Sequence, residues 1–282
     1  MSNISSMFRA IEFIEANLKE EIGVADMAEA VTYSLYHFCR VFSQVVRHSP
    51  YDYLMRRRLS ECARELLRAE QKITDIAFDY QFNSPETFSR AFKRMFKMQP
   101  NQWKKQGTLD RRFLLSKPTL AYLEHLDQDD LNPVFVEKNT LHLAGVMSLV
   151  KDDKTVVAEL WEILAQVLAG IKNSLNPPRY YGLTWYPPQG EGCFYMAATE
   201  IEPPGVSHPA LVVKTIPPGP YARFIHRGPT ETLPFTLDYI YQTWLPKSGR
   251  SLAHPLEIEA FGEDFWSFDQ KISQRKIYIP LK

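Results

Sequence analysis

The sequence of 282 residues predicts a multi-domain protein, in which an all-α domain with two helix-turn-helix motifs precedes an α+β domain of duplicated β-β-α-β-β units. Two observations support this fold class. The first half repeats one pattern of a short apolar helix, a tight turn and a capped second helix. The second half passes twice through the same order of strands and helix. We place the helical domain at 1–112, a linker at 113–131 and the α+β domain at 132–282.

The clearest copy of the helical pattern occupies residues 72–100. Apolar residues three and four positions apart predict a short helix from Ile73, and a turn follows it. Ser84 then provides an N-cap, and Pro85 takes the first helical position, where its missing N–H is not needed. The second helix combines an apolar back with a basic front. Such a helix fits the major groove of DNA, and its basic flank neutralises phosphates.

An earlier copy of the same pattern occupies residues 23–50. Ser34 caps its second helix, and each copy ends in a proline, Pro50 or Pro100. Between the copies, residues 51–69 predict a helix about 28 Å long at roughly 1.5 Å per residue. A rod of this length can hold two recognition helices about one duplex turn, roughly 34 Å, apart.

Three consecutive arginines begin this rod: Arg56, Arg57 and Arg58. They either contact phosphate or form the solvated side of the helix, and the sequence leaves both interpretations open.

Composition constrains the class of protein without identifying it. The formal net charge is +0, but 18 Lys+Arg face 14 Asp+Glu through residue 112, and 15 face 19 in the remainder. The scattered cysteines Cys39, Cys62 and Cys193 disfavour a zinc site or a disulfide framework, and a reducing cytoplasm fits them. No apolar run approaches the roughly 18 residues of a membrane span, so we expect no membrane partner.

The first half resembles the DNA-binding domain of the AraC/XylS family, from about Met7 to Lys105. The motifs that carry the resemblance are DMAEAVTYSLYHFCRVFSQVVRHSPYDYLMRRRLSECARELL and ITDIAFDYQFNSPETFSRAFKRMFKMQPNQWKK. Thr32 and Gln81 stand where family members usually carry Gly in the turns. A residue other than Gly at positive φ costs on the order of 1 kcal/mol, so we expect slightly reshaped turns.

The family pattern implies which residues face the bases of double-stranded DNA. They are Tyr36, Cys39 and Arg40 in the first copy, and Pro85, Glu86, Ser89 and Arg90 in the second. Arginine can donate two hydrogen bonds to guanine. Glu86 could accept from a cytosine amine or only complement the N-terminus of its own helix.

The second half predicts two strands, a helix and two strands, twice over. The expected elements are two strands within 133–150, a helix at 154–175, strands at 179–187 and 192–201, two strands within 210–228, a helix at 229–249, and strands at 256–262 and 275–282. This order implies internal pseudo-symmetry, typically with a cleft between the halves.

This half resembles the GyrI-like effector-binding domain in PPGPYARFIHRGP, TWLPKSG, PLEIEAFGED and IYIPLK. An AraC-type reader followed by this domain is the layout of Rob-like regulators, of the right-origin-binding-protein type. In cation-binding members of the family a buried Glu lies among aromatics, and Glu259 matches that position best, with Glu257 as the alternative. The last strand offers Gln274, Arg275 and Lys276 but no acid. The expected effector-binding residues are Tyr181, Trp185, Tyr195, Glu259, Phe261 and Tyr278.

We therefore expect a cytoplasmic, sequence-specific transcriptional regulator that senses a small aromatic, apolar or cationic molecule. One alternative is an enzyme, because some GyrI-like domains hydrolyse small electrophiles. No Ser/His/Asp set, metal-ligand cluster or Gly-rich phosphate loop is recognisable, so we expect neither catalysis nor a cofactor. The five histidines of the second half are scattered over strands and loops. A third interpretation makes this half a protein-binding module that contacts RNA polymerase or a topoisomerase.

Overall fold

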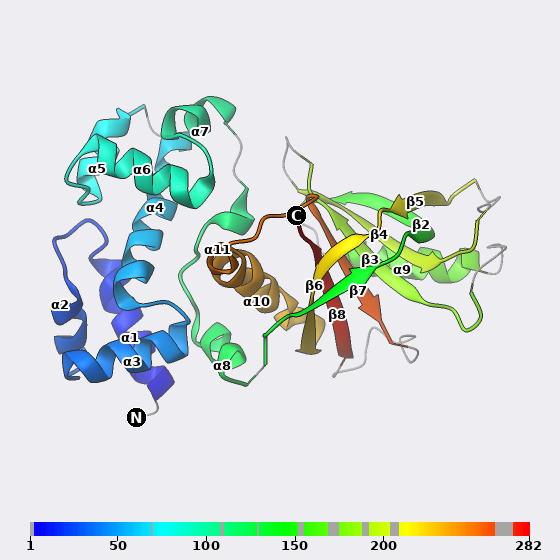
Figure 1. Ribbon diagram of the computed structural model, residues 1–282, viewed down its shortest axis with the longest axis horizontal. Coiled ribbons are helices and arrows are strands. Elements are labelled where there is room, and N and C mark those ends of the chain that lie inside the picture. Colours follow the sequence, from blue (N-terminus) through cyan, green and yellow to red (C-terminus); the bar gives the residue numbers. More distant parts are fainter. Residues whose placement is uncertain are drawn as a thin grey trace. The chain divides into compact units, whose positions relative to one another are not determined.

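The computed structural model describes residues 3–68, 70–107, 110–128, 130–151, 155–168, 175–187, 192–203, 209–262 and 273–282 (Figure 1). The chain divides into two compact units. The helical unit comprises residues 1–129 together with 234–249, and the sheet unit comprises residues 130–233 and 250–282. The segment 234–249 thus belongs to the helical unit, although it lies in the second half of the chain.

The helical unit contains the predicted duplicated motif. Its elements are α1 (Asn3–Ala16), α2 (Val24–Glu29), α3 (Leu35–Val46), α4 (Pro50–Arg68), α5 (Ile73–Asp79), α6 (Pro85–Phe96), α7 (Pro100–Gln106), the 3₁₀ turn η1 (Arg111–Phe113) and α8 (Leu120–Gln128). The predicted linker segment 113–131 therefore contains a helix, α8, which packs against α1 and α3. Both predicted caps are confirmed: Ser34 accepts the N–H of His37 at 3.4 Å, and Ser84 accepts the N–H of Thr87 at 3.2 Å.

Four residues other than glycine adopt positive φ, and they fall at matching places in the two copies. Thr32 (φ 59°) and Gln81 (φ 63°) lie in the turns, and Arg47 (φ 63°) and Lys97 (φ 59°) end α3 and α6. Thr32 is the most costly, because its Cβ is branched. Thr32 and Gln81 therefore adopt the left-handed conformation that Gly usually supplies in these turns.

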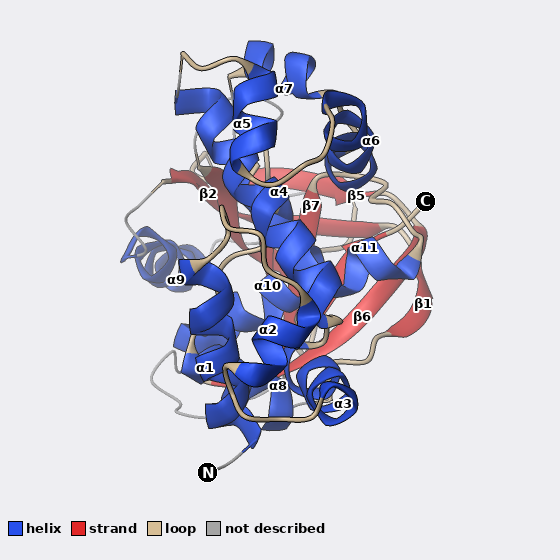
Figure 2. Ribbon diagram, turned by 90° about the vertical axis from the view of Figure 1, so that its left-hand side faces the viewer, coloured by secondary structure: helices blue, strands red, loops and turns tan. Residues whose placement is uncertain are grey.

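The helix α4 connects the two copies, as predicted. In Figure 2 it runs through the helical unit, with α3 beside one end and α6 beside the other. Its apolar side joins one continuous core with Phe38, Phe42, Phe88 and Phe92 of the recognition helices. One core thus fixes both copies on a shared rod.

The arginines at the start of α4 correct the sequence interpretation, because two of them are neither solvated nor available to phosphate. Arg57 is 4% exposed and Arg58 is 5% exposed. Arg58 donates to the carbonyls of Leu18 (2.8 Å) and Glu20 (2.6 Å). Arg58 therefore fixes the chain that leaves α1.

Arg57 joins three segments of the helical unit. Its Nε and Nη2 each lie 2.7 Å from a carboxylate oxygen of Glu15, and its Nη1 donates to the carbonyl of Leu115 at 2.6 Å. Glu61 lies 2.8 Å from the same guanidinium. Arg57 thereby ties α1 and the segment after η1 to α4.

The sheet unit has the predicted ββαββ duplication. Its elements are β1 (Val134–Lys138), β2 (Leu141–Val150), α9 (Thr155–Val167), β3 (Tyr180–Trp185), β4 (Cys193–Glu200), β5 (Val212–Ile216), β6 (Gly219–Gly228), η3 (Thr230–Thr232), β7 (Leu256–Phe261) and β8 (Ser273–Pro280). The second helix of the duplication is the segment formed by α10 (Leu233–Asp238), the π-helical turn η4 (Tyr239–Trp244) and α11 (Leu245–Ser248). We call this segment the shared helix, and it accounts for residues 234–249 of the helical unit.

The eight strands assigned in the described ranges form one antiparallel sheet, with the order β1-β6-β8-β7-β3-β4-β2-β5. Only Pro217 and Pro218 separate β5 from β6, yet β5 lies at one end of this order and β6 beside the other. The sheet must therefore curl, and its concave face carries Ile216 and Tyr221 in one apolar cluster. The helix α9 packs on the other face, against β2 and β4.

Replacing Arg57 by alanine should destabilise the helical unit by about 3–5 kcal/mol, because it leaves the carboxylate of Glu15 buried without its cation. Urea unfolding followed by far-UV circular dichroism would measure this change. Lys117→Ala is the matched control, since the exposed pair Lys117–Glu12 also joins α1 to the segment after η1. Exposed pairs contribute about 0–1 kcal/mol, so equal effects of the two substitutions would contradict the role assigned to Arg57.

Candidate functional site

The residues expected to face DNA lie on the outer sides of α3 and α6. Tyr36 is 81% exposed, and Arg40 and Arg90 are exposed as well. Exposed tyrosine and arginine side chains on a capped helix can stack, donate to base edges and neutralise phosphates. The structure gathers Tyr36, Cys39 and Arg40 on α3, and Pro85, Glu86, Ser89 and Arg90 on α6.

Glu86 lies in the first turn of α6, where the helix presents its positive end. Its own backbone N–H, the hydroxyl of Ser84 and the charge of Arg90 lower the pKa of Glu86. These contacts are compatible with the second role considered for Glu86, in which it complements the N-terminus of α6 without DNA.

The C-terminal end of the recognition helix α3 is held by the shared helix. Lys247 donates to the carbonyl of Arg47, the residue that ends α3. The next residue, His48, is 2% exposed, and its Nε2 lies 3.1 Å from the hydroxyl of Thr243. A lysine at this position also complements the negative end of α3. The placement of α3 therefore depends on a segment about 200 residues away in the sequence.

His48 connects the shared helix to α4 as well. Its Nδ1 lies 2.7 Å from a carboxylate oxygen of Asp52. Burial lowers the pKa of His48 and so favours the neutral ring, in which a proton on Nδ1 donates to Asp52 and Nε2 accepts the hydroxyl of Thr243. Burial alone would raise the pKa of Asp52, but the bond from His48 and the charge of Arg56 outweigh it and lower the pKa to about 2.

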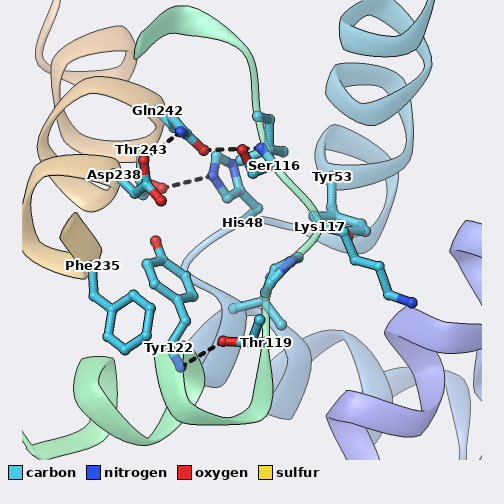
Figure 3. A pocket seen from close by; sticks show the side chains of 13 residues that line it. His48, Tyr53, Ser116, Lys117, Thr119, Tyr122, Phe235, Asp238, Gln242 and Thr243 are labelled. Atoms are coloured by element: carbon cyan, nitrogen blue, oxygen red, sulfur yellow. Dashed lines mark hydrogen bonds between the residues drawn. The ribbon is translucent and has the colours of Figure 1, made fainter. Parts of the chain in front are cut away.

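A pocket of about 60 Å³ lies beside these contacts (Figure 3). Gln242 spans its wall, since its Oε1 accepts the N–H of Ser116 at 2.9 Å and its Nε2 donates to Asp238 at 2.7 Å. Drug-sized ligands occupy pockets of roughly 300–1,000 Å³. This pocket is therefore too small to be the effector site.

The six residues expected to bind the effector do not form one site. Alternation along the strands and the cross-strand register divide them between the two faces of the sheet. The concave face carries Tyr181, Trp185 and Tyr278. The helix-covered face carries Tyr195, Glu259 and Phe261.

On the helix-covered face, Glu259 is 8% exposed and pairs with Arg275 at 2.9 Å. Trp161 of α9 donates to the hydroxyl of Tyr195 at 3.2 Å. A Cβ at Gly182 would lie 2.3 Å from that hydroxyl, so only glycine leaves room for it there. The alternative acid Glu257 is 3% exposed and accepts the hydroxyl of Tyr186. Both acids on this face are therefore already bonded within the protein.

On the concave face, Tyr181, Tyr278 and Tyr221 belong to one buried apolar cluster with Leu183 and Ile258. Trp185 lies at the end of β3, is 42% exposed and pairs with Phe194 of β4. The centre of the concave face is therefore an apolar surface that includes three tyrosine side chains.

Two groups of contacts at these sites have no local signal in the sequence. The pair Glu259–Arg275 joins neighbouring strands, and only the register of β7 and β8 reveals it. His48 and Thr243 have no sequence signal in common, because 195 residues separate them. Besides His48, the described histidines that are buried are His125 and His226, and His125 lies 2.9 Å from the hydroxyl of Thr236.

Within the described ranges, no group of three or more His, Cys, Asp or Glu side chains is placed to hold a metal ion. Nor does that part of the chain contain a helix whose length and hydropathy suffice to cross a membrane.

The two units define a helix-turn-helix protein with a curled antiparallel sheet domain. Residues 27–106 match the helix-turn-helix domain model of the AraC type, which confirms the first resemblance. Residues 131–282 match the GyrI-like small molecule binding domain, and the chain belongs to this family.

Several curated relatives are transcriptional regulators or activators by name. The chain is 38% identical over 116 residues to the uncharacterized HTH-type transcriptional regulator YbfP of Bacillus subtilis, a match that covers 41% of this chain and 38% of YbfP. It is 33% identical to the HTH-type transcriptional activator AarP of Providencia stuartii, over 39% of this chain and 81% of AarP. It is 36% identical to the right origin-binding protein of Escherichia coli, over 31% of this chain and 30% of that protein. The chain thus spans well under half of YbfP and of the right origin-binding protein.

Among solved structures, the crystal structure of the EcmrR C-terminal domain is similar to this chain at 16% identity with a TM-score of 0.46. The similarity covers 54% of this chain and 98% of that domain.

The pocket beside His48 predicts a dependence of stability on pH. Burial raises the pKa of Asp238 to about 6. Asp238 is therefore more protonated in the folded protein than in the unfolded chain between about pH 4 and 6, and the contribution of this group to stability falls as pH rises through this window. Asp238→Asn keeps an acceptor for Gln242 and removes the charge, so it should stabilise the protein by about 1–3 kcal/mol at neutral pH.

Urea unfolding at neutral pH and near pH 4 would measure this difference, which should vanish at the lower pH. The control is Asp127→Asn, which removes an exposed carboxylate on α8. Equal stability of Asp238→Asn and the wild type at neutral pH would contradict the raised pKa.

Proposed function

We propose that the chain is a sequence-specific, DNA-binding transcriptional regulator whose second half binds a small-molecule effector. One observation carries this proposal: two capped recognition helices with exposed polar and basic faces flank the ends of a single rod, α4. The names of the curated relatives and the two matched domain families support it. A cytoplasmic location is part of the proposal, because the protein must reach double-stranded DNA.

In this proposal the two recognition helices enter successive major grooves of one duplex. The helix α4 has 19 residues, which gives a length of about 28 Å. Since α3 and α6 expose different side chains, the protein reads an asymmetric site. Tyr36 and Arg40 act in one groove, and Ser89 and Arg90 act in the other.

The effector proposed from the residues is a small aromatic, apolar or cationic molecule. A cation is disfavoured at Glu259, because it would have to displace Arg275 from a buried ion pair. The alternative of a small-molecule hydrolase requires an acid available for proton transfer, and the same ion pair weighs against it. The alternative of a protein-interaction module, including contact with RNA polymerase, is tested by pull-down from purified components.

Regulation is proposed to pass through the shared helix. It lies within the residues matched by the GyrI-like domain, and it contacts the end of α3 through Thr243 and Lys247. A ligand that changes the position of the shared helix therefore changes the contacts that hold the C-terminal end of the recognition helix α3.

Selection from a pool of random duplexes, followed by footprinting with and without candidate ligands, tests the proposal. We expect one asymmetric protected site of about 20 bp, since unlike helices read adjacent grooves. A palindromic site of twice that length would show that a dimer binds. Failure to enrich any sequence would contradict specific DNA binding.

The residues assigned to base reading give a second test. Arg40→Ala and Arg90→Ala should each weaken binding to the selected duplex by about 1–3 kcal/mol, because each removes hydrogen bonds to base edges or phosphate. Fluorescence anisotropy with the labelled duplex measures the affinity. Arg227→Ala is the control, since it removes the same charge from an exposed position on β6. Unchanged affinity in both recognition-helix variants would reject the assignment.

A further inference from the structure

Basic side chains gather on the concave face of the sheet. Lys138, Arg179, Arg223 and Lys276 share this face, because their positions have the same parity as Tyr181, Tyr221 and Tyr278 along paired strands. We call these four residues the basic cluster. Its members come from β1, from the residue before β3, from β6 and from β8.

Among the described residues, the carboxylate that faces the basic cluster is that of Glu200. It lies 3.5 Å from Arg179 and accepts the hydroxyl of Tyr181 at 3.0 Å. Lys138 instead lies over the ring of Tyr278, with its Nζ 4.0 Å from the ring centroid. The Nε of Arg223 is buried and has no hydrogen-bond partner among the described residues. In the part of the chain that the structure describes, the four positive charges of the basic cluster therefore face one carboxylate, which already binds Arg179 and Tyr181.

The charges in this group act on one another. Burial lowers the pKa of Lys138, and the charges of Lys276, Arg179 and Arg223 lower it further, while Glu200 opposes them. An anion placed between these residues would be attracted by the whole group, and it would relieve the mutual repulsion of the cations.

The surroundings of the basic cluster are apolar. Tyr181, Leu183, Ile258 and Tyr278 lie on the same face and belong to one apolar cluster. The small side chain of Ala260 separates Lys276 from Tyr181 in one cross-strand row. A ligand for this face therefore combines an apolar body with a single negative group.

We propose that the concave face binds amphipathic organic anions, such as aromatic carboxylates, with the carboxylate at the basic cluster and the rings against the tyrosines. This inference rests on the proposed role of the second half as an effector-binding domain, and it names the chemical class of the effector. It differs from the cation expected at Glu259, because Glu259 lies on the opposite face and is paired.

Three probes with the same ring system test the charge preference on the full chain: 2-naphthoate, 2-naphthylmethanol and 2-naphthylmethylammonium. Isothermal titration calorimetry and thermal shift measure their binding. We expect 2-naphthoate to bind about tenfold more tightly than the neutral alcohol, with this advantage declining as salt screens the charges. The ammonium probe should bind more weakly than both.

Two variants locate the site. Lys276→Gln and Lys138→Gln should each weaken naphthoate binding about threefold to tenfold, because each removes one attracting charge. Lys151→Gln is the control, since this exposed lysine follows the far end of β2, eight residues beyond the position that pairs with Glu200. Its affinity for naphthoate should equal that of the wild type.

The outcomes separate this inference from the proposed function. Tighter binding of the alcohol or the ammonium probe would overturn the anion preference and would still support effector binding. Equal loss in all three lysine variants would overturn the location. Absence of binding by every probe would overturn the inference, whereas the selected DNA site tests the regulator role independently.

Discussion

The arrangement of the helical unit depends on contacts between the shared helix and the junction of α3 and α4. His48 is buried there between Asp52 and Thr243, and Lys247 bonds the carbonyl that ends α3. A buried imidazole without one of these partners would carry the cost of an unmade hydrogen bond, about 1–3 kcal/mol. The recognition helix and the shared helix are therefore held in one geometry, and a segment of the GyrI-like sequence match becomes part of the DNA-binding unit.

The two helix-turn-helix copies share their backbone conformations but differ in the side chains they expose. Both copies have a serine cap, a left-handed residue in the turn and another at the end of the second helix. The conformational strain of Thr32 at positive φ is offset by packing, because α2 and α3 share one hydrophobic core with α4. Duplicated geometry with unlike surfaces fits a reader of asymmetric sequences.

Local patterns predicted most of the fold, because caps, apolar spacing and strand alternation depend on residues close together in the chain. Local patterns could not predict the features that depend on contacts between residues far apart in the chain. The three adjacent arginines of α4 look equivalent in sequence. Arg57 differs because it forms a buried ion pair with Glu15, which lies 42 residues away in the chain. The effector residues were expected in one site, and the register of β3 with β7 places Tyr181 and Glu259 on opposite faces. The pairing register decides which side chains of neighbouring strands share a face, and the sequence of one strand does not show this register.

The shared helix belongs both to the GyrI-like sequence match and to the helical unit, and this has a thermodynamic consequence for the protein. If a ligand on the sheet changes the support of α3, DNA must change the affinity for that ligand by the same factor, since coupling between two binding sites is reciprocal. Molecules bound at an operator would then form a population with a different sensitivity to the effector than free molecules. The dose that switches transcription would depend on how many operators the cell contains.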